Sequence, residues 1–201
     1  MKAVMKPQLF AATLFALLAA CSNDEPAGVV PIDGVIRLSE QFTGDFDLID
    51  KTGAARVDEE FEGKVMLVYF GFTHCPDVCP GDVGVMSAAL NELGDDAGEI
   101  APIFISVDPE RDTPDALADY FAFDERIIPL TGSVEATEAA KNAFKQYAKR
   151  EELPGSALEY TVNHARFFYI ADRTGQPTHA MTGGAGPQEL AALLRQAIEN
   201  R

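Results

Sequence analysis

The chain has 201 residues, of which 16 are lysine or arginine and 32 are aspartate or glutamate, so its formal net charge at pH 7 is −16. This acidic balance argues against nucleic acid as a partner, because binding to phosphates needs clusters of lysine and arginine. The length suits a single globular domain with its own apolar core.

The first residues have the pattern of an export signal. Lys2 and Lys6 precede an apolar run from Leu9 to Ala20, and the run ends at Cys21. A basic start, a short apolar stretch and small residues before a cleavage site are typical of such signals. The run has about a dozen residues, whereas a membrane-spanning helix needs about 20.

The stretch LAAC at residues 18–21 resembles the lipobox of bacterial lipoproteins. This resemblance implies cleavage before Cys21, attachment of lipid to its thiol, and a domain anchored at the periplasmic face of a bacterial membrane. An ordinary secretory signal with an incidental cysteine is the alternative. We therefore expect a signal peptide at 1–20, a tether containing several prolines and glycines at 21–40, and a folded domain at 41–201.

Within this domain, the first predicted elements are strands and a helix. Residues 45–57 alternate apolar and polar side chains around the turn DKTG, as the strands of a β-hairpin do. Residues 64–72 are a run of β-branched and aromatic side chains, which is typical of a strand buried on both faces. Residues 80–93 carry apolar side chains at helical spacing, and residues 100–108 predict a second buried strand.

The second half of the domain continues this alternation. A helix over residues 113–123 is predicted from Thr113, a favourable N-cap residue, and from Pro114 at the first helical position. The remaining elements are a short strand at 127–132, a long amphipathic helix at 133–152, a loop at 153–164, a strand pair at 165–172 and 177–183, and a last helix at 187–200. This order predicts an α/β fold with a central mixed sheet flanked by helices and an N-terminal β-hairpin. A buried strand followed by a cysteine pair and a helix is the order found in thioredoxin.

Cys75 and Cys79 lie in the stretch YFGFTHCPDVCPG at residues 69–81, directly after the first buried strand. If they span the first turn of a helix, their Cα atoms are about 6 Å apart, which a disulfide tolerates. Thiol–disulfide enzymes of the thioredoxin kind use C-x-x-C instead, whereas two thiolates and an imidazole suit copper. The spacing alone therefore leaves a structural disulfide, a redox pair and a metal site equally open.

Three stretches together resemble the SCO/SenC family: GFTHCPDVCP at residues 71–80, SVDPERDTP at 106–114, and the lone His164 within YTVNHARFFYI. The resemblance covers nearly all of the domain. It implies a thioredoxin-like fold and the delivery of copper, as Cu(I) or Cu(II), to the binuclear copper centre of cytochrome c oxidase. It also implies that Cys75, Cys79 and His164 are the copper ligands.

The same resemblance points to acidic residues around these ligands. The family's aspartate within the cysteine loop falls on Asp77, and the acids of its second motif fall on Asp108, Glu110 and Asp112. Asp77 and Asp108 are candidates for supporting the ligands from outside the coordination sphere. Loop and helix-cap roles are the structural alternatives for both.

The residues beside His164 depart from the family pattern. The family usually has aspartate before this histidine and serine or threonine after it, whereas this chain has Asn163 and Ala165. Loss of the aspartate removes an acceptor that could orient the imidazole, and such changes commonly alter metal affinity 10- to 100-fold. We expect copper binding to persist with altered affinity or redox behaviour. The other two histidines, His74 and His179, are not expected to be ligands.

Taken with the signal, these features predict a membrane-anchored periplasmic metallochaperone rather than an enzyme. Its expected partners are the copper-bearing subunit of cytochrome c oxidase, other periplasmic copper chaperones or thiol reductases, and the membrane through its lipid. A disulfide between Cys75 and Cys79 would release the metal. One alternative is a thiol–disulfide oxidoreductase that keeps the cysteines of the oxidase subunit reduced and does not need His164. Another is a redox or copper sensor.

Overall fold

The computed structural model of the protein describes residues 32–76 and 78–200. The expected signal peptide, Cys21 and Asp77 therefore lie outside the described residues. The strands are β1 Val35–Arg37, β2 Asp47–Asp50, β3 Ala55–Val57, β4 Val65–Gly71, β5 Ile100–Ser106, β6 Ile128–Thr131, β7 Ala148–Glu152, β8 Tyr160–His164, β9 Phe167–Ala171 and β10 Pro177–Thr182. The α-helices are α1 Val78–Leu93, α2 Pro114–Tyr120, α3 Val134–Ala143 and α4 Pro187–Glu199, and 3-10 helices lie at Asp58–Phe61 (η1) and Gly94–Glu99 (η2).

Eight of these strands form one sheet, in the order β1-β10-β9-β4-β5-β6-β2-β3. The centre is parallel, because β5 pairs in parallel with both β4 and β6. The flanking pairs are antiparallel: β4 with β9, β9 with β10, and β6 with β2. The predicted mixed sheet is confirmed, and so is the N-terminal hairpin, formed by β2 and β3.

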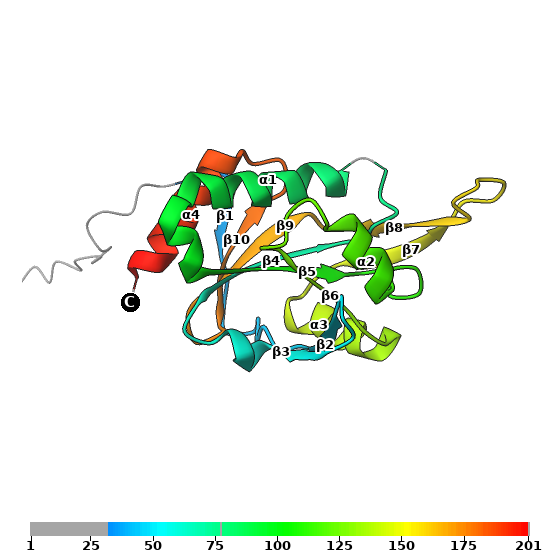
Figure 1. Ribbon diagram of the computed structural model, residues 1–201, viewed down its shortest axis with the longest axis horizontal. Coiled ribbons are helices and arrows are strands. Elements are labelled where there is room, and N and C mark those ends of the chain that lie inside the picture. The colour runs from blue at the N-terminus through cyan, green and yellow to red at the C-terminus, as the bar shows by residue number, and fades with distance from the viewer. Residues whose placement is uncertain (1–31, 77, 201) are drawn as a thin grey trace, which may run out of the picture. The chain divides into compact units, whose positions relative to one another are not determined.

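The sheet separates two apolar cores. On one face, Leu67, Tyr69 and Phe104 pack with residues of α1, α2 and α4. On the other face, Val68 and Phe70 pack with residues of α3 and β8. Figure 1 shows α1 and α4 on one side of the sheet and α3 on the other. Because both faces are covered, every residue of β4 and β5 is buried, as the sequence predicts.

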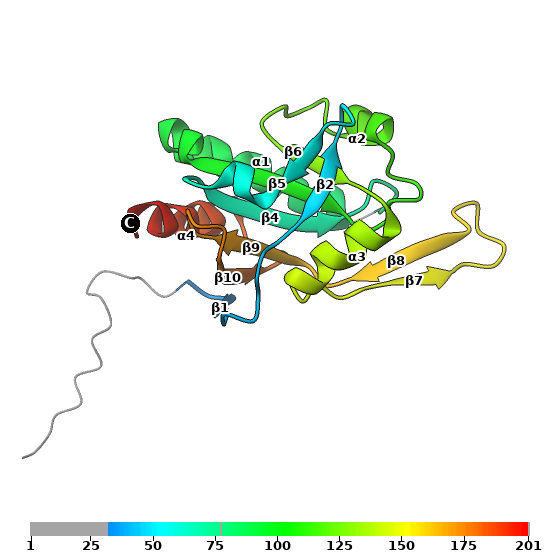
Figure 2. The ribbon, with the colours of Figure 1, turned by 90° about the horizontal axis from the view of Figure 1, so that it is seen from below.

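The predicted helix at 133–152 is wrong in its second half. Helix α3 ends at Ala143, Phe144 is fully buried, and Lys145 has a positive φ of 50°, in the left-handed region where a helix cannot continue. The following residues form β7, which pairs with β8 in a separate two-stranded sheet. Figure 2 shows this hairpin projecting beyond α3. Burial of Phe144 and backbone pairing therefore override the helical propensity of residues 148–152.

The predicted tether is also too long at its C-terminal end. Residues 35–37 form β1 and pair with β10 at the edge of the main sheet, so that Val35 lies opposite Met181. The strand has only three residues and two of them are exposed, which explains why the alternating pattern of a strand is not visible in the sequence.

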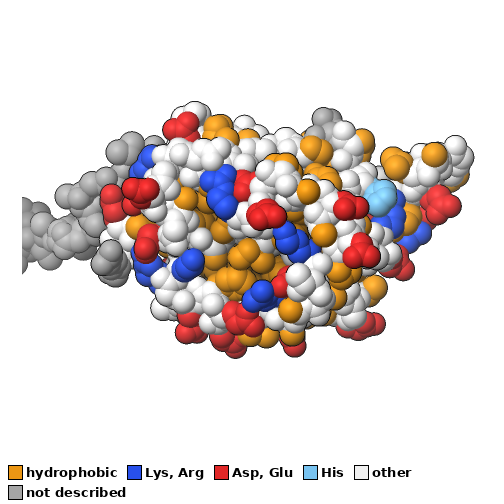
Figure 3. All heavy atoms as spheres, in the orientation of Figure 1, with side chains coloured by type: hydrophobic (Ala, Val, Ile, Leu, Met, Phe, Trp, Pro, Cys, Tyr) orange, Lys and Arg blue, Asp and Glu red, His pale blue; other side chains and the backbone are white. Residues whose placement is uncertain are grey.

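The end of the sheet that lies away from the cysteines carries a hollow of about 460 Å³. Leu90, Ile100, Pro102 and Arg126 are among the residues that line it. Figure 3 shows this apolar hollow surrounded by charged side chains.

None of the helices in the described part of the chain has both the length and the apolar composition needed to cross a bilayer.

Candidate metal centre

The two predicted thiols lie where β4 leads into α1. Cys75 is in the connecting loop and Cys79 is in the first turn of the helix, and both are buried. The backbone N–H of Cys79 donates a hydrogen bond to Cys75 Sγ over 3.4 Å. This contact brings the two sulfur-bearing residues together at the helix N-terminus, where the helix dipole favours negative charge on sulfur.

His164 is the last residue of β8, and it lies against the second thiol. Its Nε2 is 3.3 Å from Cys79 Sγ, although the two residues are 85 positions apart in the sequence. Its Nδ1 is 3.0 Å from the carbonyl oxygen of Ala165. Because a carbonyl oxygen only accepts, Nδ1 carries the proton and the lone pair of Nε2 faces the thiol. This is the tautomer that a histidine needs to bind a metal through Nε2.

Aromatic rings surround the imidazole. It packs edge-to-face against Tyr69, with ring centroids 6.3 Å apart, and against Phe72, with centroids 5.9 Å apart. Such contacts are favourable because the positive ring edge meets the negative ring face. They leave the imidazole with a restricted set of orientations before any metal binds.

The orientation of His164 also depends on Gln146, which the sequence did not indicate. The Gln146 amide donates to the carbonyl oxygen of Ala165 over 2.8 Å, and Gln146 itself accepts a hydrogen bond of 2.9 Å from the Tyr169 hydroxyl. The Ala165 carbonyl thus accepts from both the amide and the imidazole. Gln146 lies in the connection between α3 and β7, which carries no recognisable motif.

The structure explains how the chain tolerates the departure at Asn163. This side chain is exposed, and its amide donates to the carboxylate of Glu151 on the neighbouring strand, away from the imidazole. The acceptor for His164 is instead the backbone carbonyl of Ala165. An aspartate at position 163 is therefore not required to orient this histidine.

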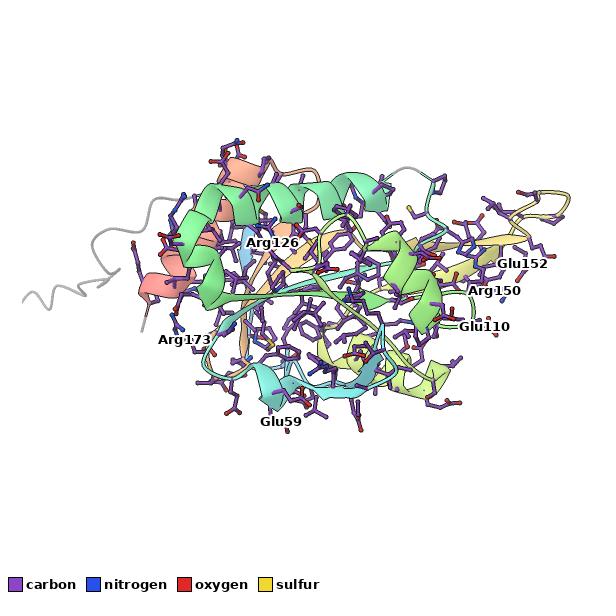
Figure 4. All side chains as sticks on the ribbon, viewed as in Figure 1. Glu59, Glu110, Arg126, Arg150, Glu152 and Arg173 are labelled. Atoms are coloured by element: carbon purple, nitrogen blue, oxygen red, sulfur yellow. The ribbon has the colours of Figure 1, made fainter. Side chains whose placement is uncertain are left out.

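Asp108 supports the hairpin that carries His164. Its buried carboxylate accepts hydrogen bonds of 2.7 Å from the Tyr160 hydroxyl and 2.5 Å from Arg111. The guanidinium groups of Arg111 and Arg150 each lie 3.6 Å from the centre of the Tyr160 ring. Arg150 also pairs with Glu110 over 3.0 Å, and Figure 4 shows these two side chains beside the hairpin. The ring of Tyr160 is thus held between two cations.

Asp112 supports the cysteine loop from the same stretch of sequence. It is fully buried and accepts hydrogen bonds of 2.6 Å from the hydroxyls of both Thr73 and Ser106, together with the backbone N–H of Thr73. Burial raises the pKa of the Asp112 carboxyl, an effect that these hydrogen bonds oppose. Thr73 lies two residues before Cys75, so this carboxyl fixes the entry to the loop.

The other two histidines lie elsewhere. His74 is exposed, and its Nδ1 is 3.0 Å from the Thr73 hydroxyl. His179 lies in β10, where burial and the nearby Arg37 lower its pKa. Met181, two residues further on, is fully buried in the apolar core.

The donor set suits a soft metal ion. Two thiols and an imidazole nitrogen are the ligands that copper binds well. Among the described residues, no three side chains of His, Cys, Asp or Glu already stand around one common point, so closing a three-ligand site requires movement of the side chains. The hydrogen bond with Cys75 and burial both raise the pKa of the Cys79 thiol. Metal binding must therefore displace its proton.

The mixed sheet with a dithiol at the start of α1 defines a thioredoxin-like protein with a candidate metal site. Residues 35–199 match the family model described as SCO1/SenC, and the chain belongs to this family.

Relatives and solved structures agree with this assignment. "Protein sco1" of Schizosaccharomyces pombe is 37% identical over 157 residues, which are 77% of this chain and 60% of that protein. A SCO2-like protein of Rickettsia conorii is 32% identical over 169 residues, 82% of each chain. The structure of Bradyrhizobium japonicum ScoI with copper bound is 36% identical, has a TM-score of 0.71, and is matched over 78% of this chain and 99% of that one. The chain spans only 60% of the length of the S. pombe protein and 52% of Saccharomyces cerevisiae SCO2.

The role of Asp112 gives a testable prediction. Asp112→Ala leaves the Thr73 and Ser106 donors without their acceptor, and we expect the free energy of unfolding to fall by about 2 kcal/mol or more. Because the loop entry is loosened, alkylation of Cys75 by iodoacetamide should accelerate. Asp119→Ala, on the exposed face of α2, is the control and should change neither quantity. An Asp112→Ala protein with unchanged stability and alkylation rate would contradict the assigned role.

Proposed function

We propose that this protein binds copper, as Cu(I) or Cu(II), through Cys75, Cys79 and His164, and delivers it to the copper-bearing subunit of cytochrome c oxidase. The observation that carries the proposal is the 3.3 Å contact between His164 Nε2 and Cys79 Sγ. Cys75 Sγ lies beside this contact, because it accepts a hydrogen bond from the backbone N–H of Cys79. The copper bound in the related ScoI structure supports the choice of metal. The oxidase as recipient follows from the resemblance of the three sequence motifs to the family.

Transfer requires that copper be held firmly but exchangeably. Three ligands leave a coordination position open, so thiolates of a recipient replace the protein's ligands one at a time. Oxidation of the two copper-bound thiolates of Cys75 and Cys79 to a disulfide removes two of the three ligands and releases the metal. The two electrons pass to the disulfide of an oxidised thiol–disulfide partner, which takes up two protons from water and becomes a dithiol. The closeness of the two residues supports such a step.

A thiol–disulfide oxidoreductase acting on the cysteines of the oxidase subunit is the second candidate. The same contact between Cys79 N–H and Cys75 Sγ favours it, because it places the thiols together. This reading gives His164 no role. The orientation of its Nε2 toward sulfur, fixed through the Ala165 carbonyl, therefore favours the copper protein.

We place the protein at the periplasmic face of a bacterial membrane, held by lipid on Cys21. Support comes from the basic start, the apolar run and the LAAC stretch. A tether between Cys21 and β1 then lets the folded domain reach a membrane-embedded recipient. Other periplasmic copper chaperones or thiol reductases are the expected sources of copper and of electrons.

Copper binding by the reduced protein tests the function. We expect one copper per chain in competition titrations against a chelator of known affinity. His164→Ala should weaken binding at least about 10-fold because it removes a ligand, whereas His179→Ala, a histidine outside the site, should bind normally. Absence of copper binding by the unaltered protein, with thiol exchange intact, would leave the oxidoreductase.

Membrane attachment through Cys21 is tested by fractionation. Cys21→Ser removes the thiol that would carry the lipid, so the protein should move from the membrane fraction to the soluble fraction, or remain as an uncleaved precursor of higher mass. Ser22→Ala is the matched control and should stay with the membrane. If Cys21→Ser were still processed and still found in the membrane fraction, the lipid anchor would be refuted.

A further inference from the structure

The ion pair between Arg166 and Asp82 joins the two segments that carry the proposed metal ligands. Asp82 lies in the first turns of α1, three residues after Cys79, and Arg166 lies in the connection between β8 and β9, two residues after His164. Arg166 Nε donates to one carboxylate oxygen over 2.8 Å and Nη2 to the other over 2.7 Å. Such two-point pairing fixes direction as well as distance.

The carboxylate of this pair is held in place from a third side. Only 2% of the Asp82 side chain is exposed, and the Tyr69 hydroxyl donates to it over 2.7 Å. Tyr69 belongs to the buried strand β4, and its ring also packs against His164. A buried carboxylate with three charge-assisted hydrogen bonds is a rigid anchor, because breaking any of them leaves charge unpaired away from water.

The backbone around Arg166 is equally constrained. The N–H of Gly183, directly after β10, donates to the Arg166 carbonyl oxygen over 2.7 Å. A Cβ atom at Gly183 would lie 2.6 Å from Arg166 Cβ and 3.0 Å from an Asp82 carboxylate oxygen. The end of β10 therefore packs directly on the ion pair and leaves no space for a side chain.

The hairpin that carries His164 needs such an anchor. Within the described residues, β7 and β8 pair only with each other, and a two-stranded hairpin is marginally stable by itself. His164 ends β8, so its position relative to α1 depends on how the next two residues are held. Gln146 orients the imidazole through the Ala165 carbonyl, and Arg166 ties the following residue to the helix.

We propose that the ion pair between Arg166 and Asp82 holds His164 in place at the metal site, which makes Arg166 a positioning residue. The inference rests on the proposed function where it concerns copper, but it also applies to the metal-free protein. Without the guanidinium, the connection after β8 is released from α1, and the imidazole is no longer held opposite Cys79 before the metal arrives.

The chain contains a matched control for this pair. Arg126 donates to both oxygens of the buried Asp124 over 2.8 and 2.6 Å, and the Ser87 hydroxyl donates to the same carboxylate over 2.5 Å. This pair also involves a residue of α1, but it lies at the apolar hollow at the other end of the sheet. Figure 4 labels Arg126 there. Arg126→Leu should therefore cost stability like Arg166→Leu without affecting the metal site.

The metal-free test is the NMR position of the His164 ring protons, which are shifted by the rings of Tyr69 and Phe72. Arg166→Leu should move these resonances toward the values of an unstructured histidine, and Arg126→Leu should not. Arg166→Lys keeps a cation beside Asp82 and so preserves folding, but one ammonium group cannot reproduce the two-point pairing. It should give an intermediate shift. Unmoved ring resonances in both Arg166 variants would overturn the inference, whether or not the protein binds copper.

The copper-loaded test is a double-mutant cycle. We expect Arg166→Leu to weaken copper binding about 10-fold when His164 is present and to have no effect in a His164→Ala background, because Arg166 acts through that ligand. An equal loss in both backgrounds would show a merely structural role and overturn the inference. Normal copper binding by Arg166→Leu together with weak binding by His164→Ala would reject the positioning role and leave the proposed function standing.

Discussion

The candidate site depends on one contact, between the Nε2 atom of His164 and the Sγ atom of Cys79. It joins a hairpin that pairs with no other strand of the described fold to the N-terminus of a helix packed on the central sheet. The imidazole offers its lone pair only because Nδ1 donates to the Ala165 carbonyl. The contact places a thiol and an imidazole nitrogen, two donors suited to a soft metal ion, 3.3 Å apart.

The stretch SVDPERDTP holds both halves of the site. Asp112 binds Thr73 ahead of the cysteine loop, while Asp108 binds Tyr160 at the start of β8. Two acids four residues apart thus fix the loop with the thiols and the hairpin with the imidazole. Through these hydrogen bonds the acidic motif supports the segments that carry the proposed ligands. The pair of Arg166 with Asp82 adds a third link between the same two segments.

Much of this arrangement could be predicted from the sequence, and the failures have physical causes. Strand β4 was predictable because both of its faces are buried, which leaves a continuous apolar run. β7 was not, because four of its five residues are exposed and its composition favours a helix. Cys75, Cys79 and His164 could be singled out from their motifs, and the structure places His164 against Cys79. Gln146 and Arg166 could not, because each acts through contacts that only the folded chain brings together.

The most direct test of the central claim is X-ray absorption spectroscopy of the copper-loaded protein and of its His164→Ala variant. The arrangement described here predicts two sulfur ligands and one imidazole nitrogen, and loss of the imidazole scattering in the variant. Coordination by sulfur alone in the unaltered protein, or imidazole scattering that persists in His164→Ala, would contradict the claim that Cys75, Cys79 and His164 bind one copper ion together.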